Sequence, residues 1–160
     1  MTPGILAAQK ATISHRIHEY RHDPQSESYG LEAAEKLGLD PARVFKTLVV
    51  TLDDGELAVA VIPVAGRLSM KRVAKALGAK RAAMAERSVV ERTTGYVIGG
   101  VSPLGQKKRL RTAIDPAVEA FETVFVSAGR RGLEIELSPV DLLALTRGLV
   151  APLCQENHSA

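Results

Sequence analysis

Two apolar segments joined by a tight turn constrain the fold more than any other feature of this sequence. Residues 44–52 and 56–63 are rich in β-branched and apolar side chains, a composition typical of strands. Asp53, Asp54 and Gly55 separate the two segments, and an acidic residue followed by glycine favours a tight hairpin turn. We therefore expect these two strands to pair at the centre of a sheet.

Short strands and helices alternate irregularly along the rest of the chain. Glycines after apolar runs and serines before them mark helix ends. Helices are expected over 2–9, 31–37, 70–77, 86–92 and from 138 onward, and further strands over 13–20, 80–84, 96–101, 113–115, 123–127 and 133–137. About seven strands and about five short helices without regular βαβ alternation predict an α+β fold around a mixed, curved β-sheet. We expect one domain over 1–152 and a disordered tail over 153–160.

Composition is that of an ordinary globular protein in a reducing compartment. Apolar residues make up 46% of the 160 residues and charged residues 24%, so one continuous core is sufficient. Cys154 is the only cysteine, which rules out an intramolecular disulfide or a Cys-rich zinc site. No apolar run approaches the roughly 18 residues of a membrane span, and residues 1–10 do not resemble a signal peptide. The expected location is the cytoplasm, and the expected oligomeric state is a monomer.

Basic residues gather beside glycine turns. Lys107, Lys108 and Arg109 follow one such turn, and Arg130 and Arg131 lie in another. Charge runs are usually solvated surface. The net charge of +3 nevertheless suits transient contact with a polyanion, so these five residues are candidates for a phosphate-contacting rim around a pocket.

Lys46 is the polar residue that stands out within the first predicted strand. Strand alternation places Val44, Lys46, Leu48 and Val50 on one face, and that face is otherwise apolar. The lysine either extends its ammonium to solvent or holds it at a pocket wall to meet a carbonyl, phosphate or carboxylate.

A glycine-rich segment over 95–109 is the second candidate. Gly99 and Gly100 would allow a ligand to approach the backbone closely, and the following loop could present amide groups to an oxyanion or phosphate. The alternative is an ordinary bulge and turn. The segment matches neither a P-loop nor a dinucleotide-binding fingerprint.

Residue spacing argues against two other kinds of site, a metal site and a serine-hydrolase triad. His15 points away from His18 and His22 on a strand, with no cysteine or suitably spaced acid beside them, so no metal site is expected. Ser102 lies in a Gly-x-Ser-x-x-Gly context, and Pro103 follows where the helix of a nucleophile elbow would begin. No serine-hydrolase triad is expected, and no cofactor is implied.

At this level of detail the chain resembles the YbaK family of aminoacyl-tRNA deacylases, relatives of the editing insertion domain of bacterial prolyl-tRNA synthetases. The resemblance covers about residues 1–150, and position 62 is Ile where the family often has Thr. Its most specific part is Lys46 together with the Gly-Gly-x-Ser-Pro-Leu-Gly element at 99–105. It also rests on Thr2-Pro3, Tyr20, the segment 45–48, and residues 62–66, 73–78, 94–96 and 131–133.

The resemblance implies hydrolysis of the ester between a wrong amino acid and the 3′ adenosine of tRNA, above all cysteine on proline tRNA. Synthetase pockets distinguish small side chains by only about 1–3 kcal/mol, so a second site must remove errors. In this family the substrate thiol or a bound water attacks, while Lys46 and the amides near Gly100 polarise and position the ester. Tyr29 stands where Phe is common. The resemblance places these residues around the substrate: Tyr20, Tyr29, Thr47, Gly99, Gly100, Val101, Ser102, Pro103, Ser127, Gly129 and Glu134.

Several functions remain compatible with the residues. The first is a free-standing Cys-tRNA(Pro) deacylase assisted by prolyl-tRNA synthetase, with Lys107, Lys108, Arg109, Arg130 and Arg131 as tRNA-phosphate candidates. An Ala-tRNA(Pro) deacylase is the sister alternative. A non-enzymatic module that binds the tRNA end or a small ligand, and a lysine Schiff-base enzyme at Lys46, are the others.

Overall fold

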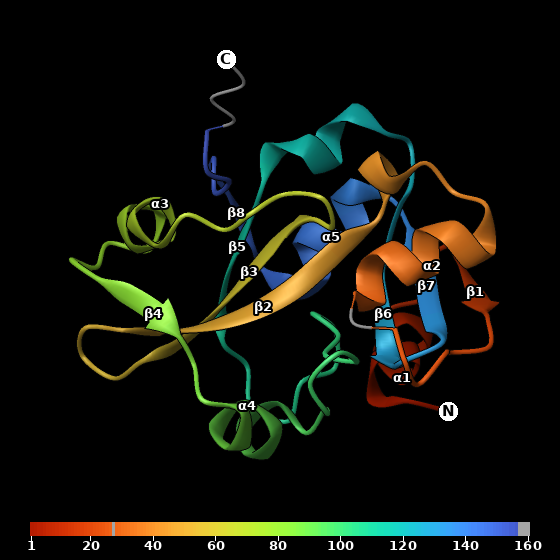
Figure 1. The fold of residues 1–160 in the computed structure, drawn as a ribbon, viewed down its shortest axis with the longest axis horizontal. Coiled ribbons are helices and arrows are strands. Elements are labelled where there is room, and N and C mark those ends of the chain that lie inside the picture. Colours follow the sequence, from red (N-terminus) through yellow and green to blue (C-terminus); the bar gives the residue numbers. More distant parts are fainter. Residues whose placement is uncertain (27, 157–160) are drawn as a thin grey trace.

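The computed structural model describes residues 1–26 and 28–156 and has an α+β fold (Figure 1). The predicted fold class is confirmed. Its helices and strands in chain order are α1 (Pro3–Lys10), β1 (His15–Glu19), α2 (Tyr29–Leu37), the 3-10 turn η1 (Pro41–Arg43), β2 (Phe45–Leu52), β3 (Leu57–Pro63), α3 (Met70–Ala76), β4 (Ala82–Met84), α4 (Arg87–Thr94), β5 (Arg111–Ile114), the 3-10 turn η2 (Pro116–Ala120), β6 (Val124–Arg130), β7 (Leu133–Leu137), α5 (Pro139–Thr146) and β8 (Leu149–Val150).

The strands form two sheets instead of the one that the sequence predicted. The larger sheet has the order β4-β2-β3-β5-β8, and the predicted hairpin of β2 and β3 lies at its centre. β2 is antiparallel to β3 and β4, whereas β3, β5 and β8 run parallel. The smaller sheet is antiparallel, with the order β1-β7-β6. Among the described residues, one bridge between Val44 and Phe125 links the two sheets, and both sheets contribute to one apolar core.

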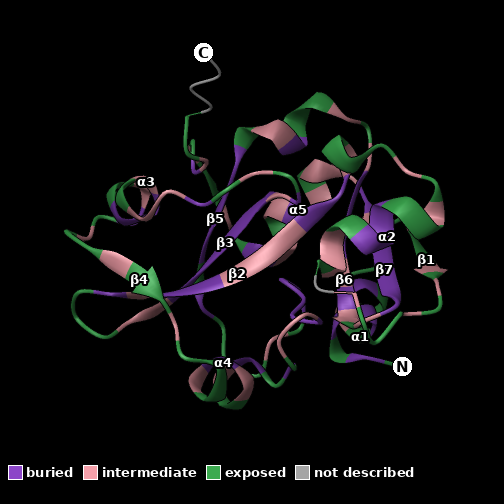
Figure 2. Cartoon of the chain, viewed as in Figure 1, coloured by how far each residue is buried: buried purple, intermediate pink, exposed green. Residues whose placement is uncertain are grey.

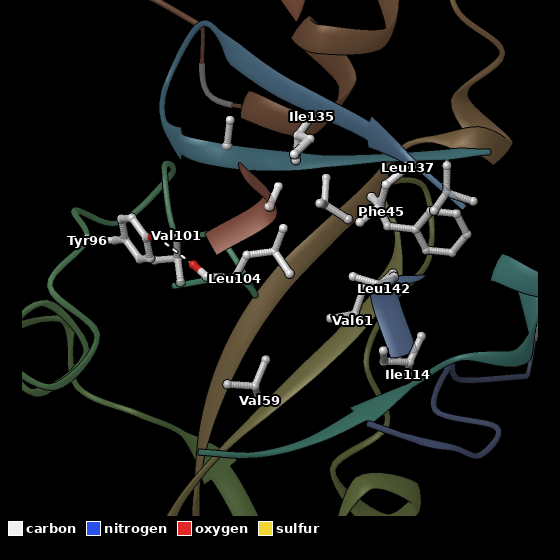
Figure 3. Packing of buried hydrophobic residues seen from close by; sticks show 14 of the residues in the cluster. Phe45, Val59, Val61, Tyr96, Val101, Leu104, Ile114, Ile135, Leu137 and Leu142 are labelled. Carbon is white, nitrogen blue, oxygen red and sulfur yellow. Dashed lines mark hydrogen bonds between the residues drawn. The ribbon is translucent and has the colours of Figure 1, made fainter. Parts of the chain in front are cut away.

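Alternation along β2 divides its side chains between two apolar layers. Phe45 and Val49 belong to the main core between the two sheets, whereas Val50 and Leu52 belong to a second cluster that α3 covers. Figure 3 shows Phe45 and Val61 of the hairpin converging with Ile135 and Leu137 of β7. β3 is buried except at its two end residues, whereas β2 is half-buried over Lys46, Thr47 and Leu48 (Figure 2). The period of two in a strand makes this two-sided burial possible.

Residues 96–101 are not a strand, which corrects one sequence prediction. Gly95 ends α4 in the left-handed conformation with φ 82°, and the chain then passes through consecutive turns. The Tyr96 hydroxyl donates a hydrogen bond of 2.6 Å to the Leu104 carbonyl (Figure 3). Tyr96 and Val101 at the two ends of this segment are therefore buried by a folded loop without a strand partner, while Val97 is 61% exposed.

Residues 153–155 pack against the rest of the fold, where the sequence predicted the start of a disordered tail. Leu153 is fully buried, and its amide donates to the Asp115 carboxylate at 3.1 Å. Cys154 forms an isolated antiparallel β-bridge with Leu68, and the Gln155 amide donates to the Arg67 carbonyl at 2.8 Å. Residues 157–160 lie outside the described residues.

The start of the chain is anchored as its sequence suggests. Thr2 caps α1 by accepting a hydrogen bond from the Ile5 amide at 3.2 Å, and Pro3 opens the helix. The Thr2 hydroxyl also donates to the Ala128 carbonyl of β6. Over residues 1–26 and 28–156, no helix combines the length and apolarity needed to cross a bilayer.

Candidate functional site

A cavity of about 330 Å³ lies where the two sheets, α2 and the loop after α4 meet. This volume is at the lower end of the range for small-molecule sites. Its wall combines residues from eight separate segments: Tyr20, Ser28, Tyr29, Gly30, Phe45, Lys46, Thr47, Leu48, Val49, Val64, Met84, Ala85, Val90, Ile98, Gly99, Val101, Ser127, Arg130, Arg131 and Glu134.

An open stretch of the β2 edge faces this cavity. Hydrogen bonds from Val64 to Val44 and from Leu52 to Glu56 fix the even-numbered residues of β2 as those that bond to β3. The odd-numbered residues therefore direct their backbone groups to the opposite edge. β4 covers that edge from Val50, and the Ala85 amide binds the Val49 carbonyl at 3.1 Å. Among the described residues no strand pairs with Thr47 there, so its amide and carbonyl can meet a ligand.

Two polar side chains on the cavity wall lack partners. The Thr47 hydroxyl is buried without a hydrogen bond among the described residues. Glu134 is only 7% exposed and also forms no hydrogen bond there. Burial raises the pKa of the Glu134 carboxyl to about 8, because water no longer stabilises the carboxylate. Buried polar groups are normally paired, so these two indicate a polar ligand.

Tyr20 and Ser127 complete the polar side of the cavity next to Glu134. Ser127 is directly opposite Glu134 in the ladder between β6 and β7. Burial, together with the charge of Glu134, raises the pKa of the Tyr20 hydroxyl to about 12. Tyr20 therefore stays protonated near neutral pH and can donate a hydrogen bond.

Lys46 brings the only lysine ammonium to the described cavity wall. Its side chain is half-buried and forms no hydrogen bond or ion pair among the described residues. Burial lowers the pKa of Lys46, and the positive charge of Arg67 adds to this effect, while Cys154 opposes it. The Lys46 ammonium is therefore unpaired among the described residues, at the edge of the apolar cluster that α3 covers. This combination is suited to an electron-rich ligand atom.

Tyr29, Gly99 and Arg131 form one contact on the opposite wall. The Arg131 guanidinium lies 3.8 Å from the Tyr29 ring centroid, and it donates to the Ile98 carbonyl at 2.9 Å. Gly99 has φ 90°, and a β-carbon there would lie 2.6 Å from the Tyr29 ring. Glycine is thus required both by the backbone conformation and by this close approach. The buried Arg131 Nε has no acceptor among the described residues.

The structure does not bring every predicted site residue to the cavity wall. Ser102 is fully buried, and its hydroxyl accepts the Leu104 amide at 3.1 Å. Gly129 packs against Tyr96 and Thr2, where a β-carbon would lie 2.8 Å from the Tyr96 ring. Pro103 lines a different hollow beside α1. These three residues therefore support the loop and its contact with α1, and they do not line the cavity.

The amides of the glycine-rich loop differ in availability. Gly100 is absent from the cavity wall, and its amide donates to the Val97 carbonyl at 2.8 Å within a turn. The family resemblance placed this amide near the ester, whereas here it is bonded within the loop. Val101 does line the cavity, and its amide has no acceptor among the described residues. Gly99 also lines the cavity, and its amide likewise has no acceptor among the described residues, so two amides of the loop are available to a ligand oxygen.

The five predicted phosphate contacts fall into two groups. Arg130 and Arg131 line the cavity, and Arg130 also approaches Glu19 at 3.5 Å. Lys107, Lys108 and Arg109 line a separate groove on the other side of α4. The single basic rim expected from sequence is therefore divided by a helix.

The histidines and the apolar lining show the limits of sequence patterns. His18 pairs with Glu136 at 2.9 Å, and His22 pairs with Glu32 at 2.6 Å, so each is held by a different carboxylate. Sequence reasoning missed Val64, Val90 and Ile98 as lining residues. Nothing local distinguishes them from ordinary core residues.

The fold and the cavity define the class of protein. It is an α+β domain with a small pocket that has polar side chains, but no cysteine or histidine, on its described wall. Residues 24–145 match the sequence profile of the aminoacyl-tRNA editing domain. The chain belongs to this family, as its sequence motifs predicted.

Individual relatives agree with this assignment. The chain is 42% identical over 120 residues to an Enterococcus faecalis protein named "Putative Cys-tRNA(Pro)/Cys-tRNA(Cys) deacylase EbsC", covering 75% of this chain and 73% of that protein. It is 29% identical over 132 residues to a proline–tRNA ligase of Shouchella clausii, covering 82% of this chain but 23% of the ligase. A solved structure described as "a putative trans-editing enzyme for prolyl tRNA synthetase" superposes with a TM-score of 0.81 at 25% identity, covering 98% and 99% of the two chains.

Proposed function

We propose that this protein removes cysteine wrongly attached to proline tRNA by cleaving the aminoacyl ester within the cavity. Family membership makes the chain an aminoacyl-tRNA deacylase. The observation that carries the finer proposal is the set of unpartnered polar groups on one small cavity wall: the Thr47 hydroxyl, the Glu134 carboxyl and the Lys46 ammonium.

Binding follows from the distribution of these groups. The open Thr47 backbone at the β2 edge receives the aminoacyl group, because its amide and carbonyl are available there. The Lys46 ammonium and the Val101 amide polarise the ester carbonyl. Arg131 brings the positive charge of its guanidinium to the oxygen-rich ribose and terminal phosphate.

No protein nucleophile is needed for the bond changes. The substrate thiol or a bound water forms a bond to the ester carbon, and the bond from that carbon to the ribose oxygen breaks. Glu134 takes the proton from the attacking group and returns it to the ribose oxygen. A carboxyl with a pKa of about 8 matches a thiol of pKa about 8.5, which favours this transfer.

A direct test compares wild type, Lys46→Ala and Lys75→Ala on Cys-tRNA, Ala-tRNA and Pro-tRNA. We expect selective loss of cysteine by wild type and a reduction of about a hundredfold in Lys46→Ala, the size typical of losing one polarising group. Lys75 is exposed on α3, so Lys75→Ala controls for loss of charge. Circular dichroism checks that each variant is folded.

The outcomes separate the competing functions. No ester loss above buffer from any substrate would overturn the deacylase, and binding without turnover would point to a binding module. Preferential loss of alanine would assign the Ala-tRNA(Pro) activity. Trapping of a carbonyl ligand on Lys46 by borohydride would instead support a Schiff-base enzyme.

The role of Glu134 has its own readout. If it accepts the proton, kcat/KM of wild type rises with pH toward about 8 as the carboxylate forms. Glu134→Gln, which keeps the shape and removes the ionisation, should be slower and lose this rise. An unchanged profile in Glu134→Gln would remove Glu134 from proton transfer while leaving the deacylase proposal in place.

We also propose that prolyl-tRNA synthetase is the cellular partner that supplies the mischarged tRNA in the cytoplasm. The likeness to part of a proline–tRNA ligase supports this partnership. Co-purification of the two proteins that depends on added proline tRNA is the expected result. Equal co-purification of an unrelated synthetase would contradict it.

A further inference from the structure

A second hollow lies on the other side of α4 from the cavity. It is an open groove of about 920 Å³ between the end of the β2–β3 hairpin, α4 and the segment 107–111. We call it the basic groove and define it by its lining residues: Thr51, Gly55, Glu56, Leu57, Glu86, Val89, Arg92, Thr93, Lys107, Lys108, Arg109, Leu110 and Arg111.

The charged side chains of the basic groove that have no partner among the described residues are predominantly positive. Arg111 is neutralised by Glu56 through two hydrogen bonds of 2.7 and 3.0 Å. The remaining basic side chains are exposed and form no hydrogen bond or ion pair among the described residues; they are Arg92, Lys107, Lys108 and Arg109. Glu86, at the start of α4, is the one remaining acid on the described wall. Four cations in one groove without acceptors favour an anionic ligand.

These cations are held by rigid structure. The Lys107 amide donates to the Thr94 carbonyl at the end of α4, at 2.9 Å. Leu110 is buried in the main core, immediately after the basic run. The three consecutive basic residues are therefore fixed between two anchored points, and their backbone does not need to become ordered when a ligand binds.

α4 is the shared wall between the groove and the cavity. Val90 lines the cavity, whereas Val89, Arg92 and Thr93 of the same helix line the groove. An α-helix with its side chains is about 10–12 Å wide. A polymer whose end occupies the cavity can therefore cross α4 and reach the groove within a few repeating units.

We propose that the basic groove binds the sugar-phosphate backbone of the RNA whose 3′ end enters the cavity. This inference rests on the proposed deacylase function. Lysine and arginine contacts to phosphates position a nucleic acid without reading its sequence, which suits an enzyme that must accept the acceptor end of a tRNA. An acidic protein surface is the alternative ligand, and the test below distinguishes the two.

The experiment measures binding of a synthetic, uncharged acceptor-stem RNA hairpin by fluorescence anisotropy across salt concentrations. The groove variant is Lys107→Ala/Lys108→Ala/Arg109→Ala. The control is Lys71→Ala/Lys75→Ala/Lys80→Ala, which removes the same charge from exposed positions on and after α3. Each phosphate contact contributes about 0.7–0.9 to the slope of log K against log salt.

We expect the groove variant to bind the hairpin at least about tenfold more weakly at low salt, with a slope smaller by about 2. The control should keep the affinity and slope of wild type. Equal weakening of the two variants would overturn the proposal, because it would show an effect of net charge alone. Unchanged binding by the groove variant would also overturn it, and would leave an acidic protein partner as the explanation.

A second measurement separates this inference from the function on which it rests. On a cysteinylated hairpin, the groove variant should raise KM about tenfold, in step with its weaker binding. Hairpin binding that depends on the groove without any ester cleavage would support the groove and contradict the deacylase. Cleavage with a wild-type KM in the groove variant would support the deacylase and contradict the groove.

Discussion

Thr47 is a residue at which stability and binding make opposite demands. Its buried hydroxyl has no partner among the described residues, and such a group costs about 1–3 kcal/mol. Thr47→Val should therefore raise the melting temperature by about 3 °C and lower kcat/KM for Cys-tRNA. Thermal unfolding and deacylation assays on the same preparations measure both effects.

A matched threonine provides the control for Thr47. The buried Thr146 hydroxyl donates to the Leu142 carbonyl at 2.8 Å and accepts the Gly148 amide at 3.1 Å. Thr146→Val should therefore lower the melting temperature. If the two substitutions changed stability in the same direction, the Thr47 hydroxyl would have a partner in solution.

Glu134 makes stability depend on pH in an unusual direction. Its folded-state pKa of about 8 is above the ordinary value of 4.5, so the folded protein binds more protons than the unfolded chain between these values. Its contribution to stability is therefore fully present below pH 4.5 and is lost as pH rises to about 8, by at most about 1.4 kcal/mol per pH unit.

The predicted comparison is urea unfolding of wild type and Glu134→Gln from pH 5 to 9. Relative to Glu134→Gln, wild type should lose stability as pH rises through this range. Groups shared by both proteins cancel in the difference. Parallel stability profiles would mean that the Glu134 carboxyl ionises normally in the folded protein.

At the scale of elements, the loop after α4 shapes the cavity by contact with α2. A β-carbon at Gly99 would lie 2.5 Å from the Arg131 Nε and 2.6 Å from the Tyr29 ring. Gly99→Ala should therefore displace the Tyr29–Arg131 pair. The expected result is a loss of about 1–3 kcal/mol in stability from backbone strain and crowding together with reduced deacylation.

Gly78 separates these two causes. It also has a positive φ, 72°, but nothing lies within 4 Å of a β-carbon there. Gly78→Ala should lose about 1 kcal/mol and keep its deacylase rate. A full rate in Gly99→Ala would show that the cavity tolerates movement of Tyr29 and Arg131.

At the scale of the whole molecule, the end of the chain closes the second apolar layer. Leu153 is fully buried in the cluster with Ile62 and Val73. Leu153→Ala should cost about 2–5 kcal/mol in urea unfolding. Leu149 is 39% exposed, so Leu149→Ala should cost far less. Similar small losses of stability in both variants would show that residues 153–156 are only loosely attached to the fold.

The sequence by itself determined the local elements and the family. Gly55 and its flanking apolar runs specified the central hairpin, and Ser69 and Ser138 marked helix starts, because these signals act between residues close together in the chain. The motif around Lys46 and the 99–105 loop identified the family, in agreement with the matched profile.

The tertiary structure decided which of these residues share a site. Residues 96–101 contain apolar side chains typical of a strand, but the turns after Gly95 fold them into a loop that buries only Tyr96 and Val101 among these apolar side chains. This loop takes Ser102 into the interior, while Gly129 packs against Thr2 and Tyr96 and Glu134 has no hydrogen-bond partner on the described cavity wall. α4 divided the predicted basic rim into two places. Local patterns report propensity, whereas burial, pairing and pKa depend on segments that only meet when the chain is folded.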